Sequence, residues 1–234
     1  FLFWVMKIAA TTLGETAGDL LSMTLNVGYF VSTLILMSGF AVVLVGQLRA
    51  KRYIPFLYWA VILATSTAGT TTSDFMNRTL GLGYATGSAI LLSTLVGVLV
   101  VWRLTEKTLS VTDVRSFRAE VFYWSAILVS NTLGTSLGDY LADDSRLGFA
   151  GGASLIGGVI ALIVAIYLVA KRMKVSSPAL YVGLFWAAFV LTRPFGATMG
   201  DVLTKTPAQG GLGFGTIGSS AVLAAVLVAV ILYT

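Results

Sequence analysis

The stretch TTLGETAGD (residues 11–19) lies inside an otherwise apolar run near the start of the chain. It carries two acidic residues, Glu15 and Asp19, and a Gly-x-x-x-Gly pair formed by Gly14 and Gly18. Related stretches follow three times, as STAGTTTSD (66–74), NTLGTSLGD (131–139) and RPFGATMGD (193–201). A segment that occurs four times in one chain indicates an internal repeat, which decides the architecture.

The repeat has a fixed internal spacing. In each copy a Trp stands ten positions before a Gly, that Gly stands five positions before an Asp, and a Gly-aromatic pair follows. The matching residues are Trp4, Trp59, Trp124 and Trp186; Gly14, Gly69, Gly134 and Gly196; Asp19, Asp74, Asp139 and Asp201; and the pairs beginning at Gly28, Gly83, Gly148 and Gly213. This pattern resembles a family of bacterial membrane proteins defined by a repeat of unknown function present four times per chain. The resemblance covers essentially the whole sequence and implies a fold more than an activity.

The composition is that of an integral membrane protein. Of 234 residues, 57% are hydrophobic and 11% are charged, whereas soluble domains carry about 25% charged residues. The lipid bilayer is therefore the expected surrounding. The chain contains no Cys and no His, which excludes disulfides, thiolate chemistry and imidazole ligands, so any metal site must use oxygen ligands.

Eight apolar segments are long enough to cross a bilayer core of about 30 Å. They are residues 1–21, 29–48, 54–77, 84–102, 119–141, 151–170, 179–203 and 214–233. The connections after the second, fourth and sixth segments hold ten Lys or Arg residues, and the opposite connections hold only Arg78, Arg146 and Lys205. The positive-inside rule then places both termini in the cytoplasm of a bacterial inner membrane. The basic residues behind the net charge of +5 are concentrated in the connections on one side. The charge is therefore interpreted as a sign of membrane topology, and no nucleic-acid partner is expected.

The predicted fold is an all-α membrane protein with eight transmembrane helices in one transmembrane domain, residues 1–234. Four parallel two-helix repeats, at about 1–49, 54–103, 118–170 and 179–233, are related by a pseudo-four-fold or pseudo-two-fold axis along the membrane normal. The first segment carries the full motif and is not expected to be a cleaved signal peptide. Because the chain begins at Phe1 without Met, a short natural N-terminal segment is expected to precede it.

The small-residue pairs and the carboxylates have different predicted roles. Gly-x-x-x-Gly spacing allows close helix packing in membranes. An Asp at the bilayer centre costs about 2.5–3.5 kcal/mol, so four copies at one depth favour a function. The predicted cation-binding and metal ligands are Glu15, Asp19, Asp74, Asp139 and Asp201. Local pairing or helix capping by each Asp is the alternative.

Two basic residues are predicted to balance this charge. Arg193 is expected to be an internal counter-ion for one Asp, and Lys7 is expected to extend toward the cytoplasmic surface. Five carboxylates against two cations leave three negative charges, which bound cations or protons would have to neutralise. Aromatic residues near the segment ends, such as Trp102, are expected in interfacial belts.

The predicted function is cation transport, as a proton-linked carrier of a hard divalent ion such as Mn²⁺, Mg²⁺ or Ca²⁺. The partners would be the inorganic cation and protons, and no cofactor is expected beyond the bound ion. A passive cation channel, or a membrane scaffold or accessory subunit in a homo-oligomer or larger complex, is the alternative. An enzyme is not expected. Intramembrane aspartyl proteases are recognised by one Tyr-Asp motif and one Gly-x-Gly-Asp motif, and this chain has neither. A rhomboid-like serine site would need His, which the chain lacks.

Overall fold

The structure is a computed structural model that describes residues 2–50, 52–111, 114 and 116–233. In this part of the chain the regular structure is entirely helical. The long helices are α1 (Leu2–Asp19), α2 (Tyr29–Arg49), α3 (Pro55–Asp74), α4 (Tyr84–Glu106), α5 (Phe117–Asp139), α6 (Gly148–Arg172), α7 (Pro178–Thr204) and α8 (Thr216–Tyr233). The predicted all-α class is confirmed. Lys51 and Arg115, counted among the basic connection residues, lie outside the described part.

Each of the first three motif helices continues directly into a π-helical turn. These turns are η1 (Leu20–Thr24), η2 (Phe75–Thr79) and η4 (Tyr140–Asp144). In the fourth copy α7 remains α-helical to Thr204, and the short 3₁₀-helix η5 (Pro207–Gln209) follows. The glycine of each Gly-aromatic pair then adopts a positive φ, between 69° and 81°, at Gly28, Gly83, Gly148 and Gly213. A residue without Cβ is favoured in this left-handed conformation, so these glycines are needed for the turn into the next helix.

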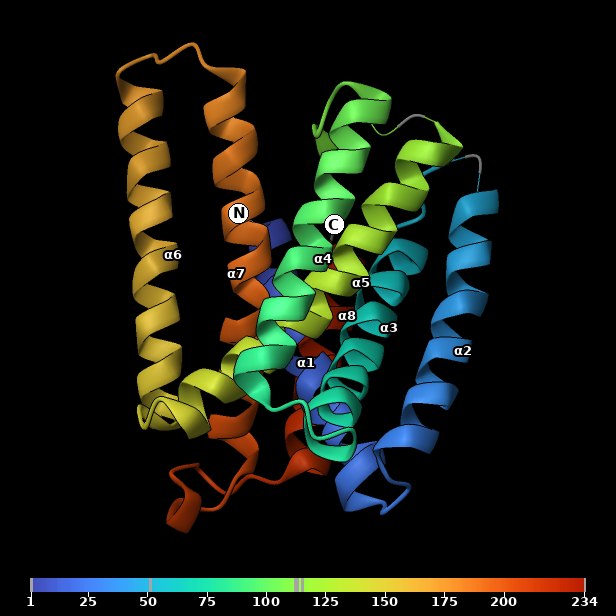
Figure 1. Ribbon diagram of the computed structural model, residues 1–234, viewed down its shortest axis with the longest axis vertical. Coiled ribbons are helices and arrows are strands. Elements are labelled where there is room, and N and C mark those ends of the chain that lie inside the picture. Colours follow the sequence, from blue (N-terminus) through green and yellow to red (C-terminus); the bar gives the residue numbers. More distant parts are fainter. Residues whose placement is uncertain (1, 51, 112–113, 115, 234) are drawn as a thin grey trace.

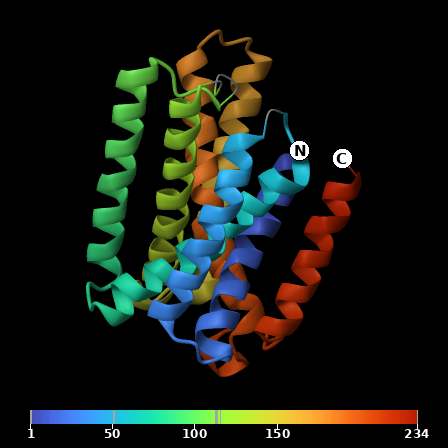
Figure 2. The same ribbon diagram turned by 90° about the vertical axis from the view of Figure 1, so that its right-hand side faces the viewer.

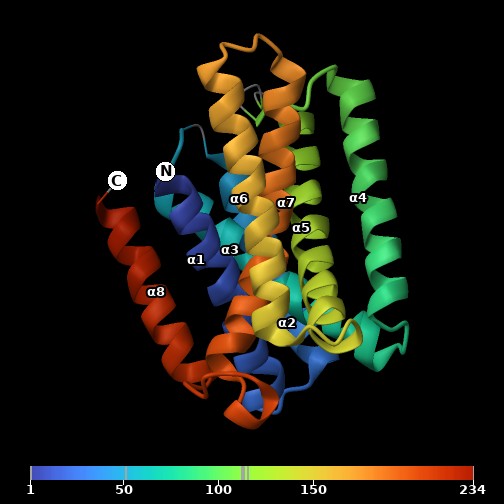
Figure 3. The same cartoon turned by 90° about the vertical axis from the view of Figure 1, so that its left-hand side faces the viewer.

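The motif helices α1, α3, α5 and α7 form a closed inner ring. Helix α1 packs against α3 and α7, and α5 packs against the same two helices. The remaining helices lie outside this ring, as α2 packs on α3, α4 on α5, α6 on α7 and α8 on α1 (Figures 1 and 3). The second helix of each repeat therefore packs against the first helix of the next repeat, and α8 closes the circle on α1.

Glycines at equivalent positions bring the inner helices together. A Cβ atom added to Gly69 would lie 3.0 Å from the backbone carbon of Asn131, and one added to Gly134 would lie 2.6 Å from Cβ of Arg193. A Cβ on Gly196 would lie 2.8 Å from Cβ of Thr11, and one on Gly14 would overlap Ser66. The four contacts run from each repeat to the next around the ring. The predicted role of the small-residue pairs in close packing is confirmed.

The two ends of the inner ring differ. One end, which we call the Trp end, contains the buried Trp59, Trp124 and Trp186. The other, the Asp end, contains Asp19, Asp74, Asp139 and Asp201, of which each is at most 3% exposed. Both chain termini lie toward the end that carries the α2–α3, α4–α5 and α6–α7 connections (Figure 2). Trp102 is 1% exposed and packs against Trp186 and Tyr123, so its expected place in an interfacial belt is wrong.

Candidate functional site

Buried residues at equivalent positions of the four inner helices form successive layers from the Trp end to the Asp end. Each layer takes one residue from α1, α3, α5 and α7, because the repeats enter the ring in the same direction. In order, the layers are Lys7, Ile62, Ile127 and Phe189; Thr11, Ser66, Asn131 and Arg193; Glu15, Thr70, Thr135 and Ala197; and Asp19, Asp74, Asp139 and Asp201. The interior is therefore mainly apolar at the first layer and polar from the second onward.

Arg193 and Glu15 form a buried ion pair within the inner ring. Nη1 of Arg193 lies 2.9 Å from Oε2 of Glu15, and the side chain of Arg193 is completely buried. Nη2 donates to the hydroxyl oxygens of Thr70 at 2.5 Å and Thr135 at 2.7 Å. The same two hydroxyls lie 3.2 and 3.1 Å from Oε2 of Glu15. One guanidinium thus joins all four inner helices, and its partner is Glu15 instead of the predicted Asp.

The four Asp residues are bridged in two pairs by cations. Arg78 lies 3.0 Å from Asp74 and 3.7 Å from Asp139. Lys205 lies 3.1 Å from Asp19 and 3.2 Å from Asp201. Burial alone would lower the pKa of Lys205, but the Asp201 and Asp19 carboxylates outweigh it and raise that pKa well above its usual range. Lys205 therefore remains protonated at neutral pH.

The sequence did not predict Arg78 and Lys205 as residues of the carboxylate site. Both stand just after an apolar segment, where a basic residue is interpreted as part of a connection. Each stands four residues after an Asp of its own repeat, which is the spacing of neighbours on a helix face. That spacing could have identified them. Copies one and three have Met23 and Asp143 at this position, so the basic residues alternate around the ring.

The charge balance differs from the predicted one. Five buried acidic residues stand against four basic residues, Lys7, Arg78, Arg193 and Lys205, of which the last three form ion pairs with them. The formal excess is therefore one acidic residue instead of three. The prediction was wrong because it counted only Lys7 and Arg193. The need for several extra cations is correspondingly smaller.

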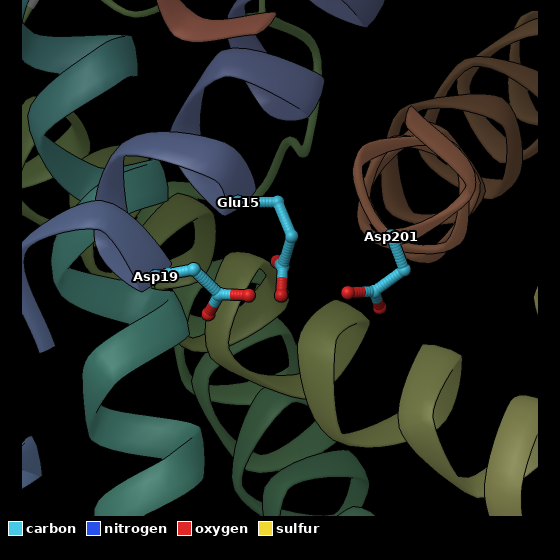
Figure 4. Close-up of side chains that lie close together, drawn as sticks. All are labelled: Glu15, Asp19 and Asp201. Atoms are coloured by element: carbon cyan, nitrogen blue, oxygen red, sulfur yellow. The ribbon is translucent and has the colours of Figure 1, made fainter. Parts of the chain in front are cut away.

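Three of the five predicted ligands converge. One carboxylate oxygen from each of Glu15, Asp19 and Asp201 can be chosen so that all lie within 4.8 Å of one another. Figure 4 shows the two carboxylates of α1 turned toward that of Asp201 on α7. Carboxylate oxygens are the ligands that hard divalent cations prefer. Asp74 and Asp139 lie instead with Arg78, so the structure divides the predicted five-residue set into a cluster of three and a pair.

Lys7 lies deep in the bundle. Its side chain is completely buried, and Nζ lies 4.1 Å from the centroid of the Phe189 ring. Among the described residues Nζ has no hydrogen-bond partner. The expectation that Lys7 extends to the cytoplasmic surface is wrong, because the side chain points into the ring and not along its outer face.

The fold and the buried polar interior define a class of protein. Five helices, α2, α4, α6, α7 and α8, are long and apolar enough to cross a membrane. The shorter apolar stretches of α1, α3 and α5 reflect the polar motif residues that they turn inward. These features indicate a multi-pass membrane protein.

The family follows from the repeat. Residues 2–53, 57–108, 122–173 and 184–234 each match the family described as Repeat of Unknown Function (DUF347), and the chain belongs to this family. The predicted four-fold repeat is confirmed. No curated protein and no solved structure matches the chain.

Proposed function

We propose that this chain is an integral membrane transporter of cations that exchanges a hard divalent ion for protons. In this proposal all eight long helices cross a bacterial cytoplasmic membrane as one transmembrane domain with four parallel two-helix repeats around the membrane normal. Both termini lie in the cytoplasm, and the Asp end lies toward the opposite face. The chain carries out no covalent chemistry.

The observation that supports transport is the convergence of Glu15, Asp19 and Asp201 inside a ring of helices. All three residues are at most 3% exposed, and buried carboxylates require counter-charges. Lys205 now provides one of them, but its side chain is 22% exposed and lies at the end of α7. An incoming divalent cation would replace the Lys205 ammonium at Asp19 and Asp201, and Lys205 would turn toward water.

Protons enter the proposal through the charge balance. A divalent ion that displaces the Lys205 ammonium from Asp19 and Asp201 raises the positive charge at the cluster by one. Closely spaced acidic groups share protons when no metal ion is bound, so release of one such proton compensates the added charge. Cation uptake and proton release are therefore linked at the same cluster.

A scaffold or accessory subunit is the second candidate. Arg193 bonds to Glu15, Thr70 and Thr135 and also lies 3.4 Å from the carbonyl oxygen of Thr11. This arrangement closes the interior between the polar layers and ties the inner helices together. Such a closed interior is expected of a scaffold protein. An open passive channel would need a continuous pore instead.

Flux into proteoliposomes tests transport directly. Purified protein is reconstituted with a metal-sensitive dye or a pH-sensitive dye inside, and Mn²⁺, Mg²⁺ or Ca²⁺ is added outside. We expect saturable uptake of at least one ion together with proton movement in the opposite direction. Asp201→Asn and Asp19→Asn should each lower uptake about ten-fold, which corresponds to about 1.4 kcal/mol of lost interaction.

The variants are chosen so that folding is preserved. Each one leaves Lys205 with one carboxylate partner, and thermal unfolding in detergent verifies the fold. Asp144→Asn changes an exposed acidic residue at the same end and should transport as the unchanged protein does. If the unchanged protein moves none of the three ions and no protons, transport is rejected and the scaffold candidate gains.

A further inference from the structure

A cavity of about 450 Å³ opens at the Trp end of the inner ring. Its volume lies within the range of about 300–1,000 Å³ that is typical of small-molecule sites. Six aromatic side chains line it: Phe3, Tyr53, Tyr58, Tyr123, Trp124 and Phe185. We call this cavity the aromatic vestibule.

The repeat explains why all four inner helices line the vestibule. Phe3, Tyr58, Tyr123 and Phe185 each directly precede the Trp of their own copy, so each inner helix contributes one ring at the same level. Hydrogen bonding and packing hold the walls in place. The hydroxyls of Tyr58 and Tyr123 lie 2.7 Å apart, and the Tyr58 ring packs against Trp124 with centroids 5.6 Å apart.

One carboxylate lies among these rings. Glu120, near the start of α5, is the acidic residue among the described residues that line the vestibule. Its Oε1 accepts hydrogen bonds from Nε2 of Gln47 at 3.3 Å and from Nε1 of Trp124 at 3.4 Å. Both bonds use Oε1 and hold the carboxyl group in place, and the side chain as a whole lines the cavity.

Aromatic faces attract cations through their quadrupole, and recognition of quaternary ammonium groups by sets of aromatic rings is a recurrent use of this attraction. A carboxylate beside the rings adds a full counter-charge. We propose that the aromatic vestibule binds an organic ammonium ion, with Glu120 as its counter-ion and the rings of Tyr53, Tyr58 and Trp124 as its walls. A hard divalent ion fits this lining less well, because such ions favour several carboxylate oxygens and Glu120 is the one carboxylate among the described lining residues.

The vestibule is separate from the carboxylate cluster. Phe3 and Asp19 are sixteen residues apart on one helix, or about 24 Å at 1.5 Å per residue. The buried layer of Lys7, Ile62, Ile127 and Phe189 lies between them, one helical turn below Phe3. These four side chains are completely buried and fill the centre of the ring, so the ligand stays beside Glu120. The inference therefore does not depend on metal transport.

Isothermal titration with choline and with its neutral isostere 3,3-dimethyl-1-butanol tests the proposal on the full chain in detergent or nanodiscs. The two probes have the same shape and differ in the charge of one atom. We expect saturable binding of choline and at least ten-fold weaker binding of the alcohol. Glu120→Gln should weaken choline binding about ten-fold, while Glu106→Gln, a nearby acid outside the lining, should leave it unchanged.

A second pair of variants tests the rings. Tyr53 is 65% exposed, so its replacement should not disturb folding. Tyr53→Phe keeps a π face and should bind choline as before, whereas Tyr53→Leu should bind it several-fold more weakly. Equal binding of choline and the alcohol would show a purely apolar cavity and overturn the proposal. Absence of choline binding, or binding of benzoate in its place, would overturn it as well.

Discussion

At the scale of single residues, Glu15 is the member of its layer that breaks the repeat. The equivalent positions hold Thr70, Thr135 and Ala197, and the layer above holds Arg193 where the other copies have Thr11, Ser66 and Asn131. The two exceptional residues pair with each other at 2.9 Å. The two residues that differ from their equivalents, in different copies, thus form one ion pair, and the surrounding hydroxyls come from Thr70 and Thr135 of the other two copies.

This pairing predicts strong coupling between the two positions. Glu15→Gln leaves the Arg193 charge buried without a counter-ion and should destabilise the fold by about 3–5 kcal/mol. The double variant Glu15→Gln, Arg193→Gln removes both charges and should lose much less than the sum of the two single variants. Thermal unfolding of the four proteins in detergent measures this coupling. Additive losses would show that the pair contributes nothing beyond its separate contacts.

The repeat allowed the sequence to predict which positions are buried. The sequence did not predict ion pairs that depend on how far a long side chain extends. The burial of the four Asp residues followed from their equal spacing. Arg78 and Lys205 could not be placed by apolar segment boundaries, because long side chains reach back into the bundle from one turn beyond. Whether Lys7 faces the ring or the lipid could not be predicted from the pattern of residues around it.

At the scale of helices, the inner ring depends on glycines that face a neighbouring backbone. A Cβ on Gly69 would lie 3.0 Å from backbone atoms of Asn131 and Thr132, which cannot rotate away. Gly97 on the outer helix α4 has no atom within 4 Å of an added Cβ. The same substitution should therefore have opposite effects at these two positions.

We expect Gly69→Ala to destabilise the protein by about 1–3 kcal/mol, because α3 and α5 must separate. Gly97→Ala should be neutral or stabilising by up to about 1 kcal/mol, since Ala has the higher helix propensity. Thermal unfolding and the monodispersity of the two variants compare them directly. Equal stability of both variants would contradict the close packing of the inner ring.

The helices also show the limits of pattern reading. Small-residue spacing predicted the close contacts, because Gly-x-x-x-Gly has few other roles in an apolar helix. The π-helical turns after Asp19, Asp74 and Asp139 have no comparable sequence pattern. Contacts with neighbouring helices, and not the local sequence, stabilise the extra residue in such a turn. In the fourth copy the Gly-aromatic pair begins twelve positions after the Asp instead of nine, and this copy lacks such a turn within the described residues.

At the scale of the whole molecule, the ring closes because α8 packs on α1. Thr24 and Thr216 also contact each other, with hydroxyl oxygens 2.8 Å apart. The first and last repeats are thus neighbours in the same way as consecutive ones. A closed ring with an even number of helices per repeat leaves all four Asp residues at one end, so the orientation of the molecule decides which side of the membrane faces the carboxylates.

The absence of native Cys makes this orientation measurable with single-cysteine variants. Asp144→Cys and Ala208→Cys lie at the Asp end, and Arg52→Cys and Ser176→Cys lie in the connections at the opposite end; all four positions are exposed. We expect a membrane-impermeant maleimide to label the first two in cells whose cytoplasmic membrane is intact. The other two should react only after that membrane is permeabilised, because ten basic residues hold their side in the cytoplasm.

Each labelling result has a distinct structural meaning. The reverse pattern would place the carboxylate cluster toward the cytoplasm, so that cation release and not uptake would begin at Asp19 and Asp201. Labelling of Arg52→Cys and Asp144→Cys from the same side would show that the segments between them do not cross the membrane an odd number of times, which would reject eight spans. The expected pattern places Lys205 at the outer surface, where its exchange between the carboxylates and water would admit a cation.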